Sequence, residues 1–238
     1  MAKVYLSPSS QVSNPYAWGS TNEAAQCRRI ADAAAAALTR SGLSVKNNQT
    51  ASMEGRVAES NAWGADLHVC IHTNAFNGRV TGTRVFSWND AGRGRAAAQA
   101  VFDELAPLTP GTSDSLSTNQ TWYELRRTAA PCVYVEAEFH DNAEATRWII
   151  EHTQQIGEAV ARGICRYFGV AYAPTPEPEG GTLHRVQVGA YAVRANAERM
   201  LARLRACAPR ASRASSQNNL KRTNKRRIRT DAPLALGL

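Results

Sequence analysis

Two histidines lie in one strand-like segment of the sequence, where a metal site could form. In Asp66–Asn74, apolar side chains alternate with polar ones. His68, Cys70 and His72 therefore share one face of an extended strand. Histidines four residues apart on a strand are separated by about 13 Å, too far to bind the same metal ion. His72 is the better candidate because it falls at the carboxyl end of its strand, where α/β sheets bind ligands.

Two carboxylates and an imidazole share one face of a second apolar segment, Cys132–Asn142. Glu136, Glu138 and His140 follow one another at intervals of two residues, which is the period of a strand. Burying such groups together is costly unless they meet a cation or each other. The segment alone is consistent with a salt-bridge network and with a metal site.

Glu23 adds a third element near the first turn of an expected helix. An acid there commonly interacts with the helix dipole and needs no further role. Together, however, Glu23, His72 and Glu136 should converge on one edge of a parallel sheet. One His, one or two carboxylates and an open position suit a catalytic zinc, which lowers the pKa of water and polarises a carbonyl. A neighbouring carboxylate can take the proton and later deliver it to a leaving amine.

Alternating short strands and helices must position these residues. Their order predicts an α/β fold with a mainly parallel twisted sheet flanked by helices. The helical spacing of apolar residues is clearest between Ile156 and Phe168, and a polar stretch, 109–121, predicts a loop. The expected strands cover about 3–6, 43–46, 67–72, 83–88 and 132–139, and the expected helices about 22–40, 52–61, 93–105 and 156–168.

A Pro- and Gly-rich linker, 171–181, divides the chain. We expect a catalytic domain over 1–170, a short, incomplete α+β module over 182–206 and a basic, disordered tail over 207–238. The first 206 residues contain 20 Lys+Arg and 19 Asp+Glu, whereas the tail contains 8 basic residues and one acid. The tail therefore carries +7 of the net charge of +8, and the nearly neutral body gives no reason to expect a nucleic-acid partner.

The sequence also restricts the compartment. It has no run of roughly 18–20 apolar residues, so no membrane span is expected. Met1 leads directly into a strand-like segment, without the pattern of a signal peptide. The five cysteines include no CxxC pair and indicate buried, unpaired thiols, so we expect synthesis in the cytoplasm and no zinc–thiolate site.

Short motifs recur in a set order between residues 3 and 169. They are Leu6-Ser-Pro-Ser-Ser-Gln11, Asn14-Pro-Tyr16, Thr21-Asn-Glu23, Ile71-His-Thr-Asn74, Glu124-Leu-Arg126, Ala130-Pro131 and Val135-Glu136-Ala-Glu-Phe-His-Asp-Asn142. As a set they resemble the zinc-dependent N-acetylmuramoyl-L-alanine amidases of the amidase-3 type. The resemblance implies Zn²⁺ as cofactor, Glu23 and His72 as zinc ligands, and Glu136 as the catalytic carboxylate.

One position departs from the family's pattern. The family usually has another zinc-binding His just after the first strand, where this chain has Ser-Ser-Gln at 9–11. We expect His140 to supply the missing imidazole, which requires the chain to curl back after Phe139. Glu138 and Gln11 are the alternative donors.

The resemblance implies a reaction and a partner. The reaction is hydrolysis of the amide between the lactyl group of N-acetylmuramic acid and the L-Ala of the stem peptide, so peptidoglycan is the expected partner and the cell wall the place of action. Residues 182–206 resemble the first half of a sporulation-related repeat domain, which binds glycan strands lacking stem peptides. The alternatives are a catalytically inactive wall-binding protein, a zinc peptidase acting within stem peptides, and a nucleic-acid-binding protein using the basic tail.

Overall fold

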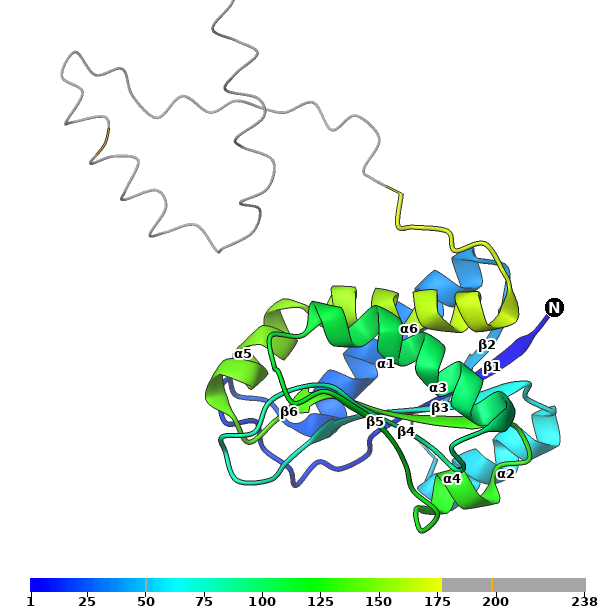
Figure 1. The fold of residues 1–238 in the computed structure, drawn as a ribbon, viewed down its shortest axis with the longest axis horizontal. Coiled ribbons are helices and arrows are strands. Elements are labelled where there is room, and N and C mark those ends of the chain that lie inside the picture. Colours follow the sequence, from blue (N-terminus) through cyan, green and yellow to red (C-terminus); the bar gives the residue numbers. More distant parts are fainter. Residues whose placement is uncertain (50, 177–197, 199–238) are drawn as a thin grey trace, which may run out of the picture. The chain divides into compact units, whose positions relative to one another are not determined.

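A six-stranded sheet organises the chain in the computed structural model, which describes residues 1–49, 51–176 and 198 (Figure 1). The strands are β1 (Lys3–Pro8), β2 (Ser44–Asn47), β3 (Leu67–Asn74), β4 (Arg84–Ser87), β5 (Ser115–Thr118) and β6 (Cys132–Phe139). Their order is β2-β1-β3-β6-β4-β5, and neighbours are parallel except for β4 and β6. The predicted mainly parallel α/β fold is therefore confirmed.

Helices cover both faces of this sheet (Figure 1). One face lies under α1 (Glu23–Arg40), α3 (Gly92–Leu105) and α6 (Thr153–Phe168), and the other under α2 (Met53–Trp63) and α4 (Tyr123–Arg127). The chain also forms α5 (Ala143–Glu151) and a 3₁₀ turn, η1 (Ala106–Leu108). Within the part of the chain that the structure describes, no helix is both long and apolar enough to cross a membrane.

The longer helices begin where the sequence predicts. The Asn22 side chain accepts a hydrogen bond from the Ala25 amide at the start of α1, and Ser52 caps α2 in the same way. Three shorter elements, β5, α4 and α5, were not predicted. The strand β5 lies inside the expected loop 109–121 and has only four residues, so it carries too little periodicity to be recognised without its partner β4.

Two faces of the sheet differ in chemistry. The face under α1, α3 and α6 is aliphatic and forms the main core, which includes Leu6, Val69 and Val135. The opposite face carries Cys70 and Cys132, which pack against Leu125 of α4. The alternation predicted for β3 therefore places its polar side chains on the face covered by α2 and α4.

Two glycines let α6 approach its neighbours closely. An added Cβ at Gly157 would lie 2.5 Å from the Ala33 Cβ and 2.7 Å from the Ile30 carbonyl oxygen of α1. An added Cβ at Gly163 would lie 2.5 Å from the Val101 Cα of α3. Both positions require glycine because backbone atoms of the facing helix occupy the space of a side chain.

We expect Gly157→Ala to lower the free energy of unfolding by about 1–3 kcal/mol, because the clash with α1 outweighs the gain in helix propensity. Urea denaturation followed by circular dichroism measures the change. Gly94→Ala is the matched control, since its Cβ would meet nothing closer than the Cys132 carbonyl oxygen at 3.7 Å. Equal stability of the two variants would show that α1 and α6 adjust freely.

Most of the described residues belong to one compact unit. Residues 1–177 form one compact unit, which contains the expected catalytic domain and the first part of the linker 171–181. The expected module 182–206 and tail 207–238 lie outside the described residues, except for Glu198.

Candidate active site

Glu23 and His72 meet at the carboxyl end of β3. The capping hydrogen bond of Asn22 fixes the first turn of α1, in which Glu23 lies. The Glu23 Oε1 is 2.9 Å from the His72 Nδ1, and both side chains are buried. The structure therefore brings together the two residues that the sequence analysis expects to be zinc ligands.

The loop after β1 adds two amide side chains to this pair. Asn14 Nδ2 donates to the Glu23 Oε2 at 2.7 Å and to the Gln11 Oε1 at 3.0 Å. The Gln11 Nε2 lies 3.5 Å from the His72 Nδ1. Burial would by itself raise the pKa of Glu23, but the interactions with His72 and Asn14 outweigh burial and hold this pKa below its usual value.

Glu136 lies beside this pair on the neighbouring strand. The register of β3 and β6 places His72 directly opposite Glu136. The Glu136 Oε2 is buried and has no hydrogen-bond partner among the described residues. Burial, together with the negative charge of Glu23, raises the pKa of Glu136 well above its usual value. This carboxyl group therefore holds a proton more readily than an exposed glutamate does.

Aromatic side chains pack against the His72 ring and restrict its orientation. The Tyr134 ring stacks on it with 4.5 Å between centroids, and Trp122 lies 4.4 Å from Tyr134. No role was predicted from the sequence for Tyr134 or for Asn14. Tyr134 is two residues from Glu136, so strand periodicity could have placed it on this face, whereas the contact of Asn14 depends on a loop that has no period.

A β-bulge changes the expected positions of Glu138 and His140. In a regular register Asn74 would pair with Glu138, but it pairs with Phe139. The extra residue in β6 ends the alternation that should have kept Glu136, Glu138 and His140 on one face. The predicted shared face is therefore wrong beyond Glu136.

Glu138 binds backbone amides of two loops. Its Oε2 accepts hydrogen bonds from the Gly82 amide at 2.7 Å and the Phe139 amide at 3.1 Å, and its Oε1 accepts one from the Gly111 amide at 3.1 Å. Both of its oxygens thus have backbone partners. This arrangement gives Glu138 a structural role in joining the loops before β4 and β5 to β6.

His140 lies in a turn and contacts the residue after His72. Its Nδ1 is 2.8 Å from the Thr73 carbonyl oxygen and 3.1 Å from the Thr73 Oγ1, and the Tyr16 ring is stacked 5.9 Å away. The Thr73 side chain leaves the opposite face of β3 from His72. Ligand atoms of Glu23, His72 and His140 do not all lie within 4.8 Å of one another, so the structure does not gather the expected three ligands.

The chain is an α/β protein with the architecture of the solved amidases. The structure of the N-acetylmuramoyl-L-alanine amidase AmiC2 of Nostoc punctiforme matches 71% of this chain and 97% of its own, with a TM-score of 0.64 and 23% identity. The family described as N-acetylmuramoyl-L-alanine amidase, Amidase_3, matches residues 9–166, and the chain belongs to this family. The SPOR domain family matches residues 137–213 and 180–224, and the second match continues beyond the expected module 182–206.

Two curated relatives have related names. The sporulation-specific N-acetylmuramoyl-L-alanine amidase of Bacillus subtilis is 27% identical over 205 residues, which are 83% of this chain and 78% of that protein. The N-acetylmuramoyl-L-alanine amidase CwlM of Bacillus licheniformis is 27% identical over 166 residues, 69% of this chain. The chain covers 62% of the length of CwlM.

Proposed function

We propose that this protein hydrolyses the amide between the lactyl group of N-acetylmuramic acid and the L-Ala of the stem peptide in peptidoglycan. The observation that carries this proposal is the position of Glu136, a buried carboxyl with an unpartnered oxygen beside the Glu23–His72 pair. The family of the chain gives the type of bond that such a site would cleave.

The donor set of this site fits a cation. The negative charge of Glu23 makes the buried Glu136 harder to ionise, and the described residues provide no lysine or arginine as an ion-pair partner of either carboxyl. We propose that Glu23 and His72 hold Zn²⁺, as the family pattern implies. When bound, zinc supplies Lewis acidity that lowers the pKa of water and polarises the amide carbonyl.

The other side chains around the proposed zinc position have separate proposed roles. The proposed role of Glu136 is to take a proton from water as general base and then deliver it to the leaving L-Ala amine. Its raised pKa makes it a stronger base than an exposed glutamate, which suits the first of these steps. The contact with Tyr134 holds the His72 ring in place, and the bond from Asn14 orients the Glu23 carboxylate.

We propose the Gln11 side-chain oxygen as the third ligand, with His140 as the alternative. The Gln11 amide lies next to His72, and rotating this amide by 180° would present its oxygen to the position now taken by Nε2. The flip would replace the present hydrogen bond from Asn14 to Gln11 with a contact between two donors, whereas Asn14 would still have Glu23 as its acceptor. His140 instead has its Nδ1 against Thr73.

We expect Gln11→Ala to weaken Zn²⁺ affinity by about 10- to 100-fold, because it removes a donor beside the Glu23–His72 pair. To measure this affinity, Zn²⁺ is added back to the metal-free protein in competition with a chromophoric chelator. His140→Ala should bind zinc as the unchanged protein does. Loss of zinc in His140→Ala and full affinity in Gln11→Ala would reverse the assignment.

Mass spectrometry of digested peptidoglycan tests the reaction itself. An amidase leaves intact lactyl groups on the glycan and a free amine on L-Ala. New amines at other stem-peptide positions would identify the zinc peptidase instead. Digests in which the unchanged protein matches a Glu136→Ala variant would support the inactive wall-binding protein.

We further propose the domain arrangement expected from the sequence, with a catalytic domain over 1–170 joined by the linker 171–181 to a glycan-binding module. The SPOR match is what supports the second part. Pull-down on glycan strands stripped of stem peptides, comparing the full chain with residues 1–176, tests it. Equal retention of the two proteins would remove the binding role from the C-terminal part.

A further inference from the structure

A second group of potential metal ligands lies on the same face of the sheet, closer to the amino ends of β3 and β6. His68 and Cys70 come from β3, and Cys132 begins β6. One ligand atom from each lies within 4.8 Å of the other two, and all three side chains are buried. This is the one such group of three among residues 1–49, 51–176 and 198. Cys70 precedes His72 by two residues, so the group is about 7 Å from the proposed active site.

The distance between the two sulfurs suits a shared metal ion. Cys70 Sγ and Cys132 Sγ are 3.9 Å apart. Two thiolates bound to one tetrahedral zinc at about 2.3 Å each are separated by about 3.8 Å. A disulfide is poorly matched, because the strand register places Cys70 opposite Tyr134 and Cys132 opposite His68. Two strand positions offset in this way have Cα atoms about 8 Å apart, beyond the reach of a disulfide.

Neighbouring polar groups orient the His68 ring. Its Nδ1 is 3.0 Å from the Ser60 Oγ, and its Nε2 is 3.1 Å from the Glu124 Oε1. Ser7 donates a hydrogen bond to the same Glu124 oxygen. A metal-binding histidine keeps an outer partner on one nitrogen, which fixes the tautomer and the plane of the ring. Both His68 nitrogens have partners in this structure, so metal binding through one of them would replace its present contact. The Tyr5 ring, stacked 5.1 Å away, further restricts the imidazole.

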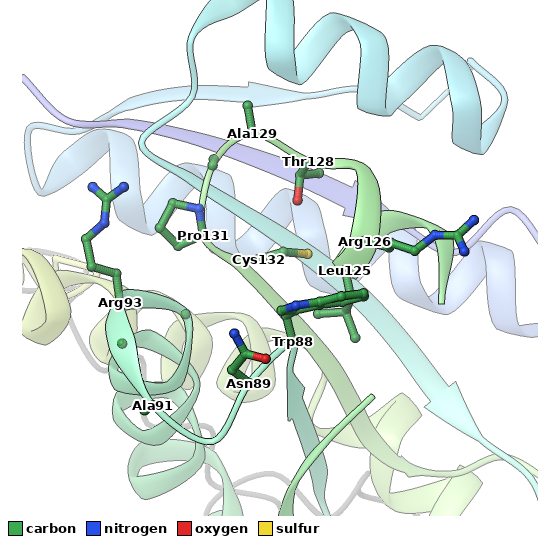
Figure 2. Close-up of a pocket in the computed structure, with 13 residues that line it drawn as sticks. Trp88, Asn89, Ala91, Arg93, Leu125, Arg126, Thr128, Ala129, Pro131 and Cys132 are labelled. Atoms are coloured by element: carbon green, nitrogen blue, oxygen red, sulfur yellow. The ribbon is translucent and has the colours of Figure 1, made fainter. Parts of the chain in front are cut away.

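A cavity of about 400 Å³ gives this group an access route (Figure 2). Cys132 is one of its lining residues, together with Leu125 and Pro131, and Figure 2 shows the Cys132 sulfur near the centre of these side chains. The cavity opens at the amino end of β6, whereas Glu136 lies toward its carboxyl end. Of the three residues, Cys132 lines this cavity, so a metal ion can approach its side of the group without passing the proposed active site.

Although the sequence predicts no zinc–thiolate site, we propose from this geometry that His68, Cys70 and Cys132 bind one thiophilic metal ion of the zinc class. Two thiolates and an imidazole are a donor set that selects such ions over magnesium or calcium. Three protein ligands leave a fourth position for water or a small ligand entering through the cavity. The proposal does not depend on the amidase function, because none of the three residues belongs to the Glu23–His72 pair.

Cobalt substitution tests this site. The full chain, in a Cys207→Ala background, is reduced, freed of metal with a chelator and titrated with Co²⁺. We expect a thiolate-to-cobalt charge-transfer band, with about half or more of its intensity lost in Cys70→Ala and in Cys132→Ala. Cys165→Ala is the matched control, since Cys165 is also a buried free thiol and lies in α6. Circular dichroism of each variant checks that it folds.

The outcomes separate this proposal from the proposed function. A charge-transfer band requires thiolate, so Glu23→Gln should leave it unchanged whether or not the Glu23–His72 pair binds zinc. Absence of the band in the folded unchanged protein would overturn the proposal. Persistence of the full band in folded Cys70→Ala and Cys132→Ala would overturn it as well.

Discussion

Glu136→Gln is expected to lower the rate of amide hydrolysis by about 10²- to 10⁴-fold, the contribution typical of a general acid–base residue. Glutamine has nearly the same shape as glutamate but cannot take a proton from water or deliver one to the leaving amine. Release of soluble fragments from purified peptidoglycan measures the rate. The effect should be on turnover, because the Glu23–His72 pair is unaltered.

Two measurements make this result interpretable. Zinc content of Glu136→Gln should equal that of the unchanged protein, since Glu136 is proposed to exchange protons rather than to bind metal. Glu144→Gln is the control, because Glu144 is exposed at the start of α5. If Glu136→Gln retained full activity, the proposed role of this residue would have to be given up.

Glu138→Ala is expected to lower the free energy of unfolding by about 3 kcal/mol or more. The substitution removes the acceptor of three backbone amides, those of Gly82, Gly111 and Phe139. Each buried amide left without a partner costs about 1–3 kcal/mol, although water can reach part of this site after truncation. Chemical denaturation at neutral pH measures the loss.

The same variant tests whether Glu138 binds metal. As a structural residue, it should leave the zinc affinity of the folded protein unchanged at low temperature. Glu151→Ala is a suitable control because Glu151 is exposed and its ion-pair partner among the described residues is Arg147 on the same helix, a contact worth about 0.5 kcal/mol or less. Unchanged stability together with lost zinc would place Glu138 in the metal site after all.

Local patterns in the sequence determined the class of fold and three of the proposed site residues. The expected strand ends placed His72 and Glu136 at one edge of the sheet, and the expected first turn of a helix placed Glu23 at the same edge. These predictions depend on short-range regularities and on the rule that parallel strands end at a common edge. The structure brings Glu23 and His72 into contact and places Glu136 on the adjacent strand opposite His72.

Only the tertiary structure determined which of the polar side chains contact one another. The bulge in β6 arises in pairing with β3, and it directs Glu138 to the loops and His140 to Thr73. The approach of Cys70 to Cys132 likewise depends on the register of two strands separated by more than 50 residues. No local pattern encodes the register of distant strands, because packing of the whole sheet selects it. The sequence by itself thus determined which residues carry chemistry at the sheet edge, and the folded chain determined which of them meet.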